Sequence, residues 1–369
     1  MKLVVNGRFL TQPVTGVQRY ARELMATLDQ LLDRGELDRS RLEVELLSPR
    51  LRGGAPPWRH VSHREVGRLS GHAWEQLELP RAAHGDVLFC PGNTAPLAAL
   101  AGAMRTVVTV HDLSYLYFPD AYSLAFRAAY RTLVPAVLRH ADAVVTVSES
   151  ERRAIVERYP FTGGRLVAIQ NGGLPAAARP FDGPPPPRTH ALYVGALSKR
   201  KNFPGVLAAA VRLNRERALP FVFVGGGGST FQPVVADVPP DVRGRLTFAG
   251  QVDRLDECVR FYRSALCLVF PSFYEASPLP PVEAMACGCP VIASRIPSLL
   301  ERCGDAALYC DPHDVGDIAR AVARLADDAA LRQSLVEKGY ERARRFSWEA
   351  CARRTLEVIE SVASGRAQR

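Results

Sequence analysis

Short apolar runs alternate with longer amphipathic segments along most of the chain. In the first half, the pattern predicts strands at 2–5, 44–48, 86–90, 106–112, 143–148 and 165–172, with helices at 18–32, 123–139 and 149–159. The runs are apolar throughout, which is typical of parallel strands buried on both faces. Strands that alternate with helices in this way predict an α/β sheet with crossover helices.

The alternation stops at a Pro-rich stretch, 174–188, and then restarts. Its four consecutive prolines cannot join a helix or a central strand, so the stretch predicts a semi-rigid linker. The second series predicts strands at 190–195, 220–226, 245–250, 266–272, 290–294 and 306–310, and closing helices at 314–327, 329–344 and 348–363. We therefore expect Rossmann-like domains at 1–175 and 190–345, a linker at 176–189, and a C-terminal helix in 346–369 that packs back on the first domain.

The composition fits two globular domains. A chain of 369 residues with 47% hydrophobic side chains is long and apolar enough to bury two cores. No apolar run approaches the roughly 20 residues that cross a bilayer, and the run at 2–5 is too short for the core of a secretion signal. The eight cysteines form no Cys-x-x-Cys pair, so we do not expect zinc. Because no export signal is apparent, we expect reduced thiols in a cytoplasmic protein.

The charge of the chain favours an anionic partner. The formal net charge is +9 and the pI is about 9.3. Such an excess suits a nucleic acid, a sugar nucleotide or the inner surface of a membrane. The sequence has no aromatic-rich basic motif of RNA-binding proteins and no metal-finger spacing, so we do not expect a nucleic acid as the partner.

The segment 270–294 carries more chemical information than any other. Pro280 and Pro281 suit the first turn of a short helix at 279–287, where a missing N–H costs nothing, and Gly288 suits the position just past its end. The N-terminus of a helix offers unpaired backbone N–H groups and a partial positive charge. Both favour the binding of phosphate.

Two carboxylates flank this helix start. We expect Glu275 in the loop that leads to the helix and Glu283 within its first turn. Carboxylates beside a phosphate site repel the anion unless each binds a hydroxyl group, so the arrangement suggests a ligand with both phosphates and sugars. A pair of solvated charges at a helix end is the simpler interpretation.

A basic turn follows the first predicted strand of the second half. Arg200 and Lys201 are adjacent at a strand-to-helix turn, where they suit a pyrophosphate group. In open α/β sheets, ligands bind outside the carboxyl ends of the strands. A solvated basic turn is the alternative interpretation.

Other candidates also fall at element ends. Gly16 precedes a predicted helix and lets a ligand approach the backbone closely, although a single Gly there is also an ordinary turn residue. His111 closes a predicted strand; a lone histidine is usually structural, and the adjacent Asp112 can serve to fix the loop. The Gly-rich stretch 224–231 has Thr230 in place of the third glycine of a dinucleotide-binding fingerprint, so we interpret it as a turn.

The segment 270–294 resembles the signature of retaining glycosyltransferases of the GT-B fold, in the group-one family (family four). That signature is a Glu, seven residues, a second Glu, and then Ala-Met-Ala-x-Gly-x-Pro-Val. It stands here as Glu275, Glu283, Ala284, Met285, Ala286, Gly288, Pro290 and Val291. The resemblance implies two Rossmann-like domains that face each other across a cleft, with the acceptor on the first domain and the donor on the second.

The resemblance also implies an activity. The chain is expected to move a hexose-type sugar from a GDP- or UDP-sugar to a glycan or lipid-linked acceptor, with retention of configuration and without a metal or other cofactor. Bacterial surface polysaccharide or exopolysaccharide synthesis is the implied setting. Peripheral contact with the cytoplasmic face of the inner membrane is a further expectation.

Site residues are carried over by resemblance to the family's motifs. Arg200 and Lys201 are expected to hold the donor diphosphate, together with N–H groups near Leu279 and the backbone at Gly16.

The remaining roles concern sugars, base and acceptor. Glu283 is expected to bind the ribose hydroxyls, Glu275 the hydroxyls of the transferred sugar, and His111 the sugar or acceptor near the reacting centre. The backbone at Val252 is expected to meet the base. Asn171-Gly172 lies near the domain junction, where a hinge role and a ligand contact fit equally well.

The chain departs from the family's pattern beside these residues. Ala276-Ser277-Pro278 stand where Gly-Phe-Gly is frequent, and Pro278 cannot donate an N–H. Ala196 stands where many members have an Arg, so one cation is missing unless Lys199 compensates. The identity of the donor sugar is therefore not fixed by the sequence.

An acceptor surface is expected on the first domain. Arg8, Arg19, Arg22 and the region from Trp58 to Trp74 suggest a basic, aromatic face that suits a lipid-linked or polysaccharide acceptor. An ordinary solvated surface explains the same residues.

Two other functional classes fit part of the pattern. A nicotinamide-dependent oxidoreductase on two Rossmann halves lacks its Gly-x-Gly-x-x-Gly after the first strand. A catalytically silent scaffold is compatible with the changes at 276–278, whereas the intact Glu275, Glu283 and Lys201 favour catalysis.

Overall fold

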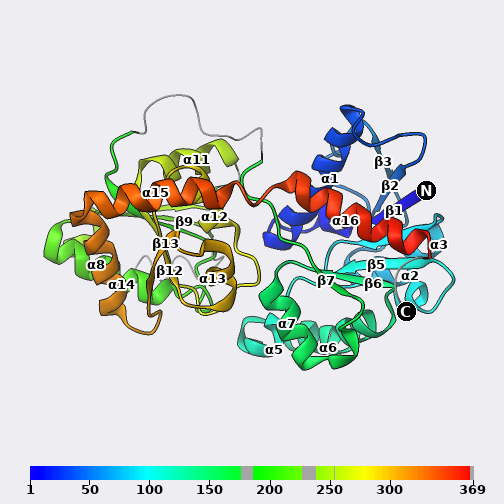
Figure 1. The fold of residues 1–369 in the computed structure, drawn as a ribbon. Helices are drawn as coiled ribbons and strands as arrows, with labels where there is room; N and C mark the ends of the chain where they lie inside the picture. Colours follow the sequence, from blue (N-terminus) through cyan, green and yellow to red (C-terminus); the bar gives the residue numbers. More distant parts are fainter. Residues whose placement is uncertain (176–185, 227–237, 253, 366–369) are drawn as a thin grey trace. The chain divides into compact units, whose positions relative to one another are not determined.

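A computed structural model describes residues 1–175, 186–226, 238–252 and 254–365 as two compact units (Figure 1). Unit 1 consists of Met1–Gly172 and Trp348–Arg369, and unit 2 of Gly173–Ser347. The chain therefore crosses between the units twice. Residues 176–185 of the predicted linker lie outside the described residues.

Unit 1 is built on a parallel sheet with the strand order β3-β2-β1-β4-β5-β6-β7. Its strands are β1 (Lys2–Asn6), β2 (Glu43–Ser48), β3 (Val61–Glu65), β4 (Val87–Cys90), β5 (Arg105–Thr109), β6 (Ala143–Thr146) and β7 (Leu166–Ala168). The strand order reverses between β1 and β4. Open α/β sheets bind ligands outside the carboxyl ends of the strands at such a switch point.

The helices of unit 1 connect these strands. They are η1 (Gly7–Thr11), α1 (Gly16–Asp33), α2 (Gly71–Leu77), α3 (Leu79–Ala82), α4 (Leu97–Leu100), α5 (Ser114–Tyr117), η2 (Pro119–Ala121), α6 (Leu124–His140), α7 (Glu149–Arg158), η3 (Pro160–Thr162) and α16 (Trp348–Ala363). Two of these helices begin with a polar cap whose side chain accepts from a free N–H group, Ser123 for α6 and Ser148 for α7.

The apolar pattern does not predict β3 or α2. β3 is the edge strand of the sheet, and after the buried Val61 its side chains are polar and exposed or half-buried. Charged residues on an edge strand discourage pairing with other chains, and they also remove the apolar run by which a strand is recognised. The pairing of β3 with β2 therefore depends on the sheet and not on the local sequence.

α16 packs in unit 1 against α1, although more than 300 residues separate them in sequence (Figure 1). The ring of Tyr20 lies 6.2 Å from that of Trp348, and Arg34 pairs with Glu349 at 3.1 Å. The first residue of α16 also contacts the last residue before the first chain crossing, because Trp348 lies directly against Gly172.

Unit 2 repeats the architecture with the parallel order β10-β9-β8-β11-β12-β13. Its strands are β8 (His190–Val194), β9 (Phe221–Val224), β10 (Leu246–Gly250), β11 (Ala265–Phe270), β12 (Val291–Ser294) and β13 (Ala307–Cys310). Its helices are α8 (Phe203–Arg217), α10 (Pro240–Arg243), α11 (Leu255–Ser264), α12 (Leu279–Ala286), α13 (Pro297–Cys303), α14 (Val315–Asp327) and α15 (Ala329–Ala343). The strand order reverses between β8 and β11.

Both faces of this sheet are buried, as the continuous apolar runs predict. In β11, Cys267 and Val269 belong to one apolar cluster, whereas Leu268 and Phe270 belong to another. Successive residues of a strand point to opposite faces, so each cluster covers one face.

Several strands end earlier than the apolar pattern predicts. β5 ends at Thr109 instead of 112, and β11 ends at Phe270 instead of 272. The buried residues that follow belong to loops that turn over the carboxyl edge of the sheet. These loops carry most of the candidate site residues.

The cysteines of the chain are mostly buried. All eight cysteines are free thiols, and seven of them are buried.

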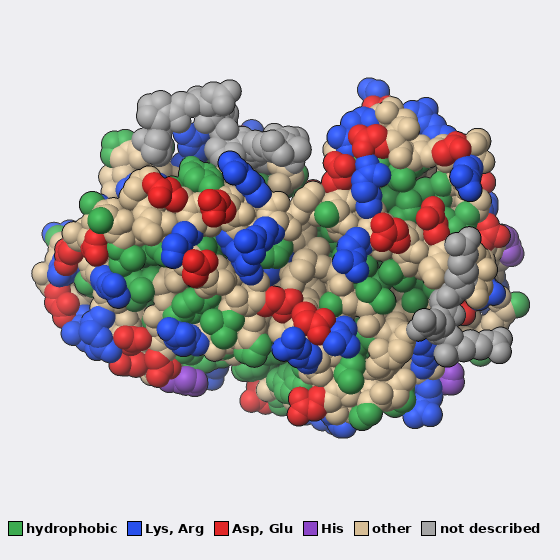
Figure 2. Space-filling model, in the orientation of Figure 1, with side chains coloured by type: hydrophobic (Ala, Val, Ile, Leu, Met, Phe, Trp, Pro, Cys, Tyr) green, Lys and Arg blue, Asp and Glu red, His purple; other side chains and the backbone are tan. Residues whose placement is uncertain are grey.

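No helix among the described residues has both the length and the apolar character needed to cross a membrane. Lys and Arg side chains are interspersed with Asp and Glu over the face shown in Figure 2, so this face has no single basic patch.

We predict that Gly172→Ala destabilises unit 1 by roughly 1–3 kcal/mol. A Cβ at this position would lie 2.3 Å from the Trp348 ring, which is buried and cannot move away easily. Thermal denaturation would measure the loss. Gly164→Ala is the control, because a Cβ there meets nothing within 4 Å, and equal melting temperatures for the two variants would contradict the prediction.

Candidate functional site

The loops after β8 and β11 meet at the switch point of the unit 2 sheet. The first loop spans 195–202 and the second 271–278. They are joined by backbone as well as side chains, because Phe273 N–H donates to the carbonyl of Arg200 at 3.0 Å. The two segments singled out in the sequence therefore form one site within unit 2.

A buried ion-pair cluster lies between these loops. Lys201 Nζ donates to Glu275 Oε1 at 2.7 Å, and Arg200 Nη1 lies 3.5 Å from Glu275 Oε2. Ser272 Oγ also donates to Glu275 Oε1 at 3.0 Å. The side chains of Glu275 and Lys201 are only 8% and 13% exposed, whereas that of Arg200 is 24% exposed. Two cations and one carboxylate leave a net charge of +1 in this cluster.

The charge state of the cluster follows from its mutual contacts. Burial by itself raises the pKa of Glu275, but the Lys201 ammonium and the Arg200 guanidinium outweigh it and hold that pKa below its usual range. Burial lowers the pKa of Lys201, and the Glu275 carboxylate opposes this effect. The Lys201 ammonium also lies 4.9 Å from the centre of the Phe270 ring. Each charge in the pair thus favours the ionised form of the other.

Close backbone packing sets the position of Lys201. Gly195 has φ +153°, and a Cβ there would lie 3.0 Å from Lys201 Cδ. Gly225, in the loop after β9, has φ +145°, and a Cβ there would lie 1.9 Å from the Gly195 carbonyl oxygen. Only glycine fits these two positions without strain. The Gly-rich stretch therefore supports the loop of Lys201, while its residues 227–231 lie outside the described part.

The helix α12 begins directly after the cluster. Pro278 stands at the N-cap position without a capping hydrogen bond from its side chain. Among the first four residues of the helix, Pro280 and Pro281 have no N–H, so only Leu279 and Val282 carry one. This N-terminus therefore offers an anion fewer backbone donors than most helices. Gly288, with φ +70°, follows the end of the helix, as the sequence predicts.

The expectation that Glu283 lies in the first turn of α12 is wrong. Glu283 is the fifth residue, and the first turn contains no acidic residue. Two of the first three residues of α12 are prolines, which suit a first turn, so the helix starts at Leu279. Glu283 is 2% exposed, and its Oε2 accepts a hydrogen bond from the Tyr262 hydroxyl at 3.0 Å.

Val252 lies after β10, farther along the same edge of the sheet. It is partly buried against the apolar cluster that contains Tyr262 and Phe270, and its carbonyl accepts from Cys258 Sγ at 3.8 Å. Val252 is not a member of the ion-pair cluster of Arg200, Lys201 and Glu275.

His111 lies in unit 1, where the loop after β4 holds it at two points. Its backbone N–H donates to Asn93 Oδ1 at 2.7 Å, and its Nε2–H donates to the carbonyl of Pro91 at 2.8 Å. The second bond fixes the neutral tautomer with its proton on Nε2. Burial lowers the pKa of His111, although the Pro91 carbonyl and Asp112 oppose this effect.

Gly16 and His111 are linked through α1. Gly16 is the first residue of this helix, is exposed, and a Cβ there would meet nothing within 4 Å. Tyr20, one turn later, packs its ring edge-on against His111 at 4.8 Å. Asp112 accepts from Ser114 N and Oγ at 2.9 and 2.6 Å, which fits the loop-fixing interpretation.

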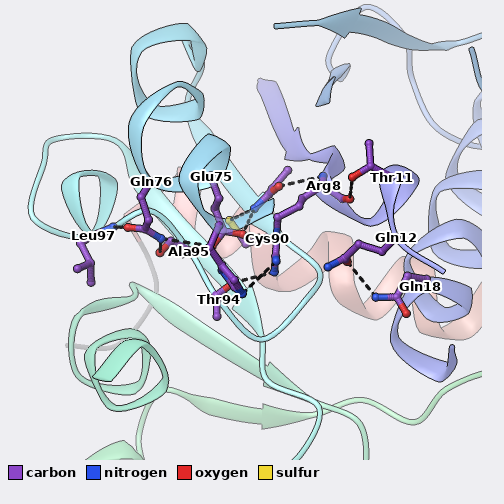
Figure 3. A network of polar contacts seen from close by, with 12 residues as sticks. Arg8, Thr11, Gln12, Gln18, Glu75, Gln76, Cys90, Thr94, Ala95 and Leu97 are labelled. Atoms are coloured by element: carbon purple, nitrogen blue, oxygen red, sulfur yellow. Dashed lines mark hydrogen bonds and ion pairs between the residues drawn. The ribbon is translucent and has the colours of Figure 1, made fainter. Parts of the chain in front are cut away.

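The switch point of unit 1 contains a polar network that the sequence reasoning missed (Figure 3). Arg8 pairs with Glu75 at 2.8 Å and donates to Thr94 Oγ1 at 3.0 Å and to His72 Nε2 at 3.2 Å. Asn6 Nδ2 donates to Glu75 Oε2 at 3.0 Å. Burial raises the pKa of Glu75, but the Arg8 charge and the hydrogen bonds from His72 and Thr94 outweigh it and hold that pKa below its usual range. The signal in the sequence was Arg8 itself, which stands two residues after the end of β1.

This network corrects the basic, aromatic face predicted on unit 1. Arg8 is buried against Glu75, and Trp74 is fully buried with its Nε1–H donating to the Val66 carbonyl at 2.8 Å. Trp58, Arg19 and Arg22 are half-buried. The sequence does not show that Glu75 is the acidic partner against which Arg8 is buried.

The arrangement in unit 2 suits an anion. Its cations are partly exposed, ionised and held in place, and the adjacent helix start adds a partial positive charge. No group of three or more His, Cys, Asp and Glu residues in the described ranges could hold a metal ion.

Two family models together match most of the chain. Residues 14–172 match "Glycosyltransferase Family 4", and residues 177–342 match "Glycosyl transferases group 1". The O-antigen chain mannosyltransferase B of Escherichia coli is 32% identical over 272 residues, which is 69% of this chain and 70% of the relative. The chain spans 56% and 57% of the length of two further curated relatives.

Solved structures share the fold. Sucrose-phosphate synthase from Thermosynechococcus elongatus is similar with a TM-score of 0.74 and 21% identity, over 99% of both chains. HepE from Anabaena, in complex with UDP-glucose, is similar with a TM-score of 0.72 and 14% identity, over 98% of this chain and all of that chain. At these identities the likeness shows the GT-B fold alone.

We predict that Glu275→Gln destabilises unit 2 by roughly 3–5 kcal/mol at pH 7, because it leaves Lys201 without its buried counter-charge. The folded-state pKa of Glu275 is lowered, so its stabilisation is complete above the ordinary Glu value of about 4.3 and is lost as the pH falls through the folded value. Urea denaturation at pH 7, 5, 4 and 3 should show the wild-type advantage shrinking below about pH 4.

Asp305→Asn is the matched control for this series. Asp305 pairs with Lys338 at 3.0 Å at the surface of the same unit, and such pairs contribute at most about 1 kcal/mol. An equal loss in both variants, or a Glu275→Gln loss independent of pH, would contradict the role of the buried pair.

Proposed function

Because this chain belongs to the group 1 glycosyl transferases, we propose that it transfers a hexose-type sugar from a nucleotide-diphosphate sugar to a glycan or lipid-linked acceptor, with retention of configuration. The observation that carries the proposal is the cluster of Arg200, Lys201 and Glu275 at the switch point of unit 2. A diphosphate matches its net positive charge, and switch points are where such sheets bind nucleotides.

The proposed chemical step moves negative charge toward the cluster. The bond between the anomeric carbon and the diphosphate oxygen breaks, and its electron pair stays on the diphosphate. The acceptor oxygen then forms a bond to the same face of the anomeric carbon, and its proton passes to the departing phosphate oxygen. Lys201 and Arg200 stabilise the leaving group, because cations already in place cost no reorganisation as the charge develops.

Glu275 is proposed to bind hydroxyls of the transferred sugar and to keep Lys201 charged. Lys201 and Ser272 already donate to its Oε1, which makes this carboxylate a weak covalent nucleophile. Glu283 is proposed to bind the ribose and the backbone at Val252 the base. With few N–H groups at the start of α12, the side-chain cations carry most of the phosphate binding, with Leu279 N–H as one backbone donor.

In unit 1, we propose that His111 contacts the sugar or the acceptor. Its Nε2–H is engaged by Pro91, so the ring would present Nδ1 as an acceptor of a hydroxyl hydrogen bond. Gly16 is proposed to let the donor diphosphate approach the backbone, since nothing occupies the space beside its Cα.

The donor base and the setting rest on relatives. One relative is named an O-antigen chain mannosyltransferase, and one similar structure binds UDP-glucose. We therefore propose a GDP- or UDP-sugar as the donor and a bacterial polysaccharide pathway as the setting. We propose that the protein acts in the cytoplasm and reaches its acceptor at the inner surface of the membrane.

The first test of this function is a thermal-shift panel with UDP, GDP, ADP and NAD. We expect UDP or GDP to raise the melting temperature and NAD to have no effect. Lys201→Ala should remove the shift and lower kcat/KM about 100- to 1,000-fold, as for other groups that stabilise a leaving anion. Lys338→Ala, which removes a surface lysine from the same unit, should leave both unchanged.

The outcomes of the panel separate the functional classes. A shift with NAD alone would favour an oxidoreductase, and no shift with any nucleotide would favour a silent scaffold. A Lys201→Ala variant that is folded and fully active would contradict the role assigned to the cluster.

The second test concerns the stereochemistry. Incubation with an α-linked donor and no acceptor should slowly release the free sugar as its α-anomer, because retention places water on the face that the diphosphate leaves. Proton NMR before mutarotation detects the first-formed anomer, and an initial β-anomer would contradict retention. The rate should be the same with EDTA as without, because we propose a reaction that needs no metal.

A further inference from the structure

A buried tyrosine contacts the proposed ribose-binding carboxylate. Tyr262, on α11, is fully buried, and its hydroxyl donates to Glu283 Oε2 at 3.0 Å. Glu283 comes from α12, which packs against α11 (Figure 1). Two helices that are separate in sequence thus bring one hydroxyl and one carboxylate together.

The surroundings make this polar contact costly. Tyr262 belongs to an apolar cluster with Leu192, Val259, Leu268 and Met285. A buried carboxylate and hydroxyl lose their hydration, and replacing both partners by apolar groups of the same shape can be nearly neutral or stabilising. Phe at 262 would fill nearly the same space, so packing alone does not require the hydroxyl.

The contact gives Glu283 a fixed orientation. A glutamate side chain has several rotatable bonds, and a hydrogen bond to one carboxylate oxygen from a rigid, buried ring restricts them. Both oxygens of a carboxylate accept hydrogen bonds, so a carboxylate held in one rotamer can receive two neighbouring hydroxyls at once. The 2′ and 3′ hydroxyls of a ribose are such a pair.

We propose that Tyr262 is a positioning residue that holds Glu283 in the orientation needed to bind both ribose hydroxyls, and so sets the preference for ribonucleotides over 2′-deoxyribonucleotides. This inference rests on the proposed function, because it takes the ribose of a nucleotide-diphosphate sugar as the ligand of Glu283. Tyr262 touches no ligand in this proposal and acts through Glu283.

The test compares matched nucleotides in Tyr262→Phe. Isothermal titration gives the Kd of UDP and of 2′-deoxy-UDP, or of GDP and 2′-deoxy-GDP if GDP binds the wild type better. We expect Tyr262→Phe to reduce the ribo-over-deoxy preference about three- to tenfold, which corresponds to one hydrogen bond. The affinity for inorganic pyrophosphate, which has no ribose, should stay unchanged.

Tyr309→Phe is the matched control. Tyr309 lies in β13 of the same unit, and its hydroxyl donates to the Gly304 carbonyl at 2.6 Å. This variant also loses one tyrosine hydrogen bond but should keep the wild-type preference. In a Glu283→Gln background, Tyr262→Phe should have no further effect on the preference, since the two residues act as one unit.

Each result has a distinct meaning. An unchanged preference in folded Tyr262→Phe, or equal losses for both nucleotides and pyrophosphate, would overturn the positioning role. If this variant does not fold, Glu283→Asp tests the same contact, because its shorter side chain cannot reach both Tyr262 and the ribose, and a retained preference would overturn the proposal. A wild type that binds no nucleotide would instead overturn the proposed function itself.

Discussion

The buried pair of Lys201 and Glu275 is the interaction on which the arrangement of unit 2 depends. It joins the loops after β8 and β11, the two strands between which the sheet order reverses. A charge this buried is stable only with its partner, so the pair fixes the two loops relative to each other. Gly195 and Gly225 are needed because the aliphatic part of Lys201 and the neighbouring backbone occupy the space of a side chain.

The same constraint explains how the proposed site would hold an anion although prolines stand at the second and third residues of α12. Pro280 and Pro281 remove N–H groups from the helix start, so the positive charge comes from side chains. Arg200, which is more exposed than Lys201, keeps a hydrogen bond to the Tyr274 carbonyl at 2.9 Å and is held at the rim of the cluster. Preformed cations of this kind act without rearrangement when charge develops.

The two sheets have related strand orders but use their switch points differently. In unit 1, Arg8 forms an ion pair with Glu75 and donates hydrogen bonds to His72 and Thr94. The side chains of Arg8 and Glu75 are 7% and 0% exposed. In unit 2, two cations share one carboxylate, and the charge does not cancel. The charge of Arg8 in unit 1 is therefore balanced by a carboxylate, whereas the cluster in unit 2 keeps a net positive charge.

Continuous apolar runs and the positions of proline and glycine act locally, so the amino-acid sequence alone predicts the two parallel sheets, most of their strands and helices, the basic turn and the segment from Glu275 to Glu283. It did not determine the edge strand β3, the inward turn of Arg8 and Trp74, or the place of Glu283 beyond the first turn of α12. Nor did it show that Tyr262 contacts Glu283. Those features are contacts between segments far apart in the chain, and only the folded structure decides which charge meets which partner and which side chain loses its water.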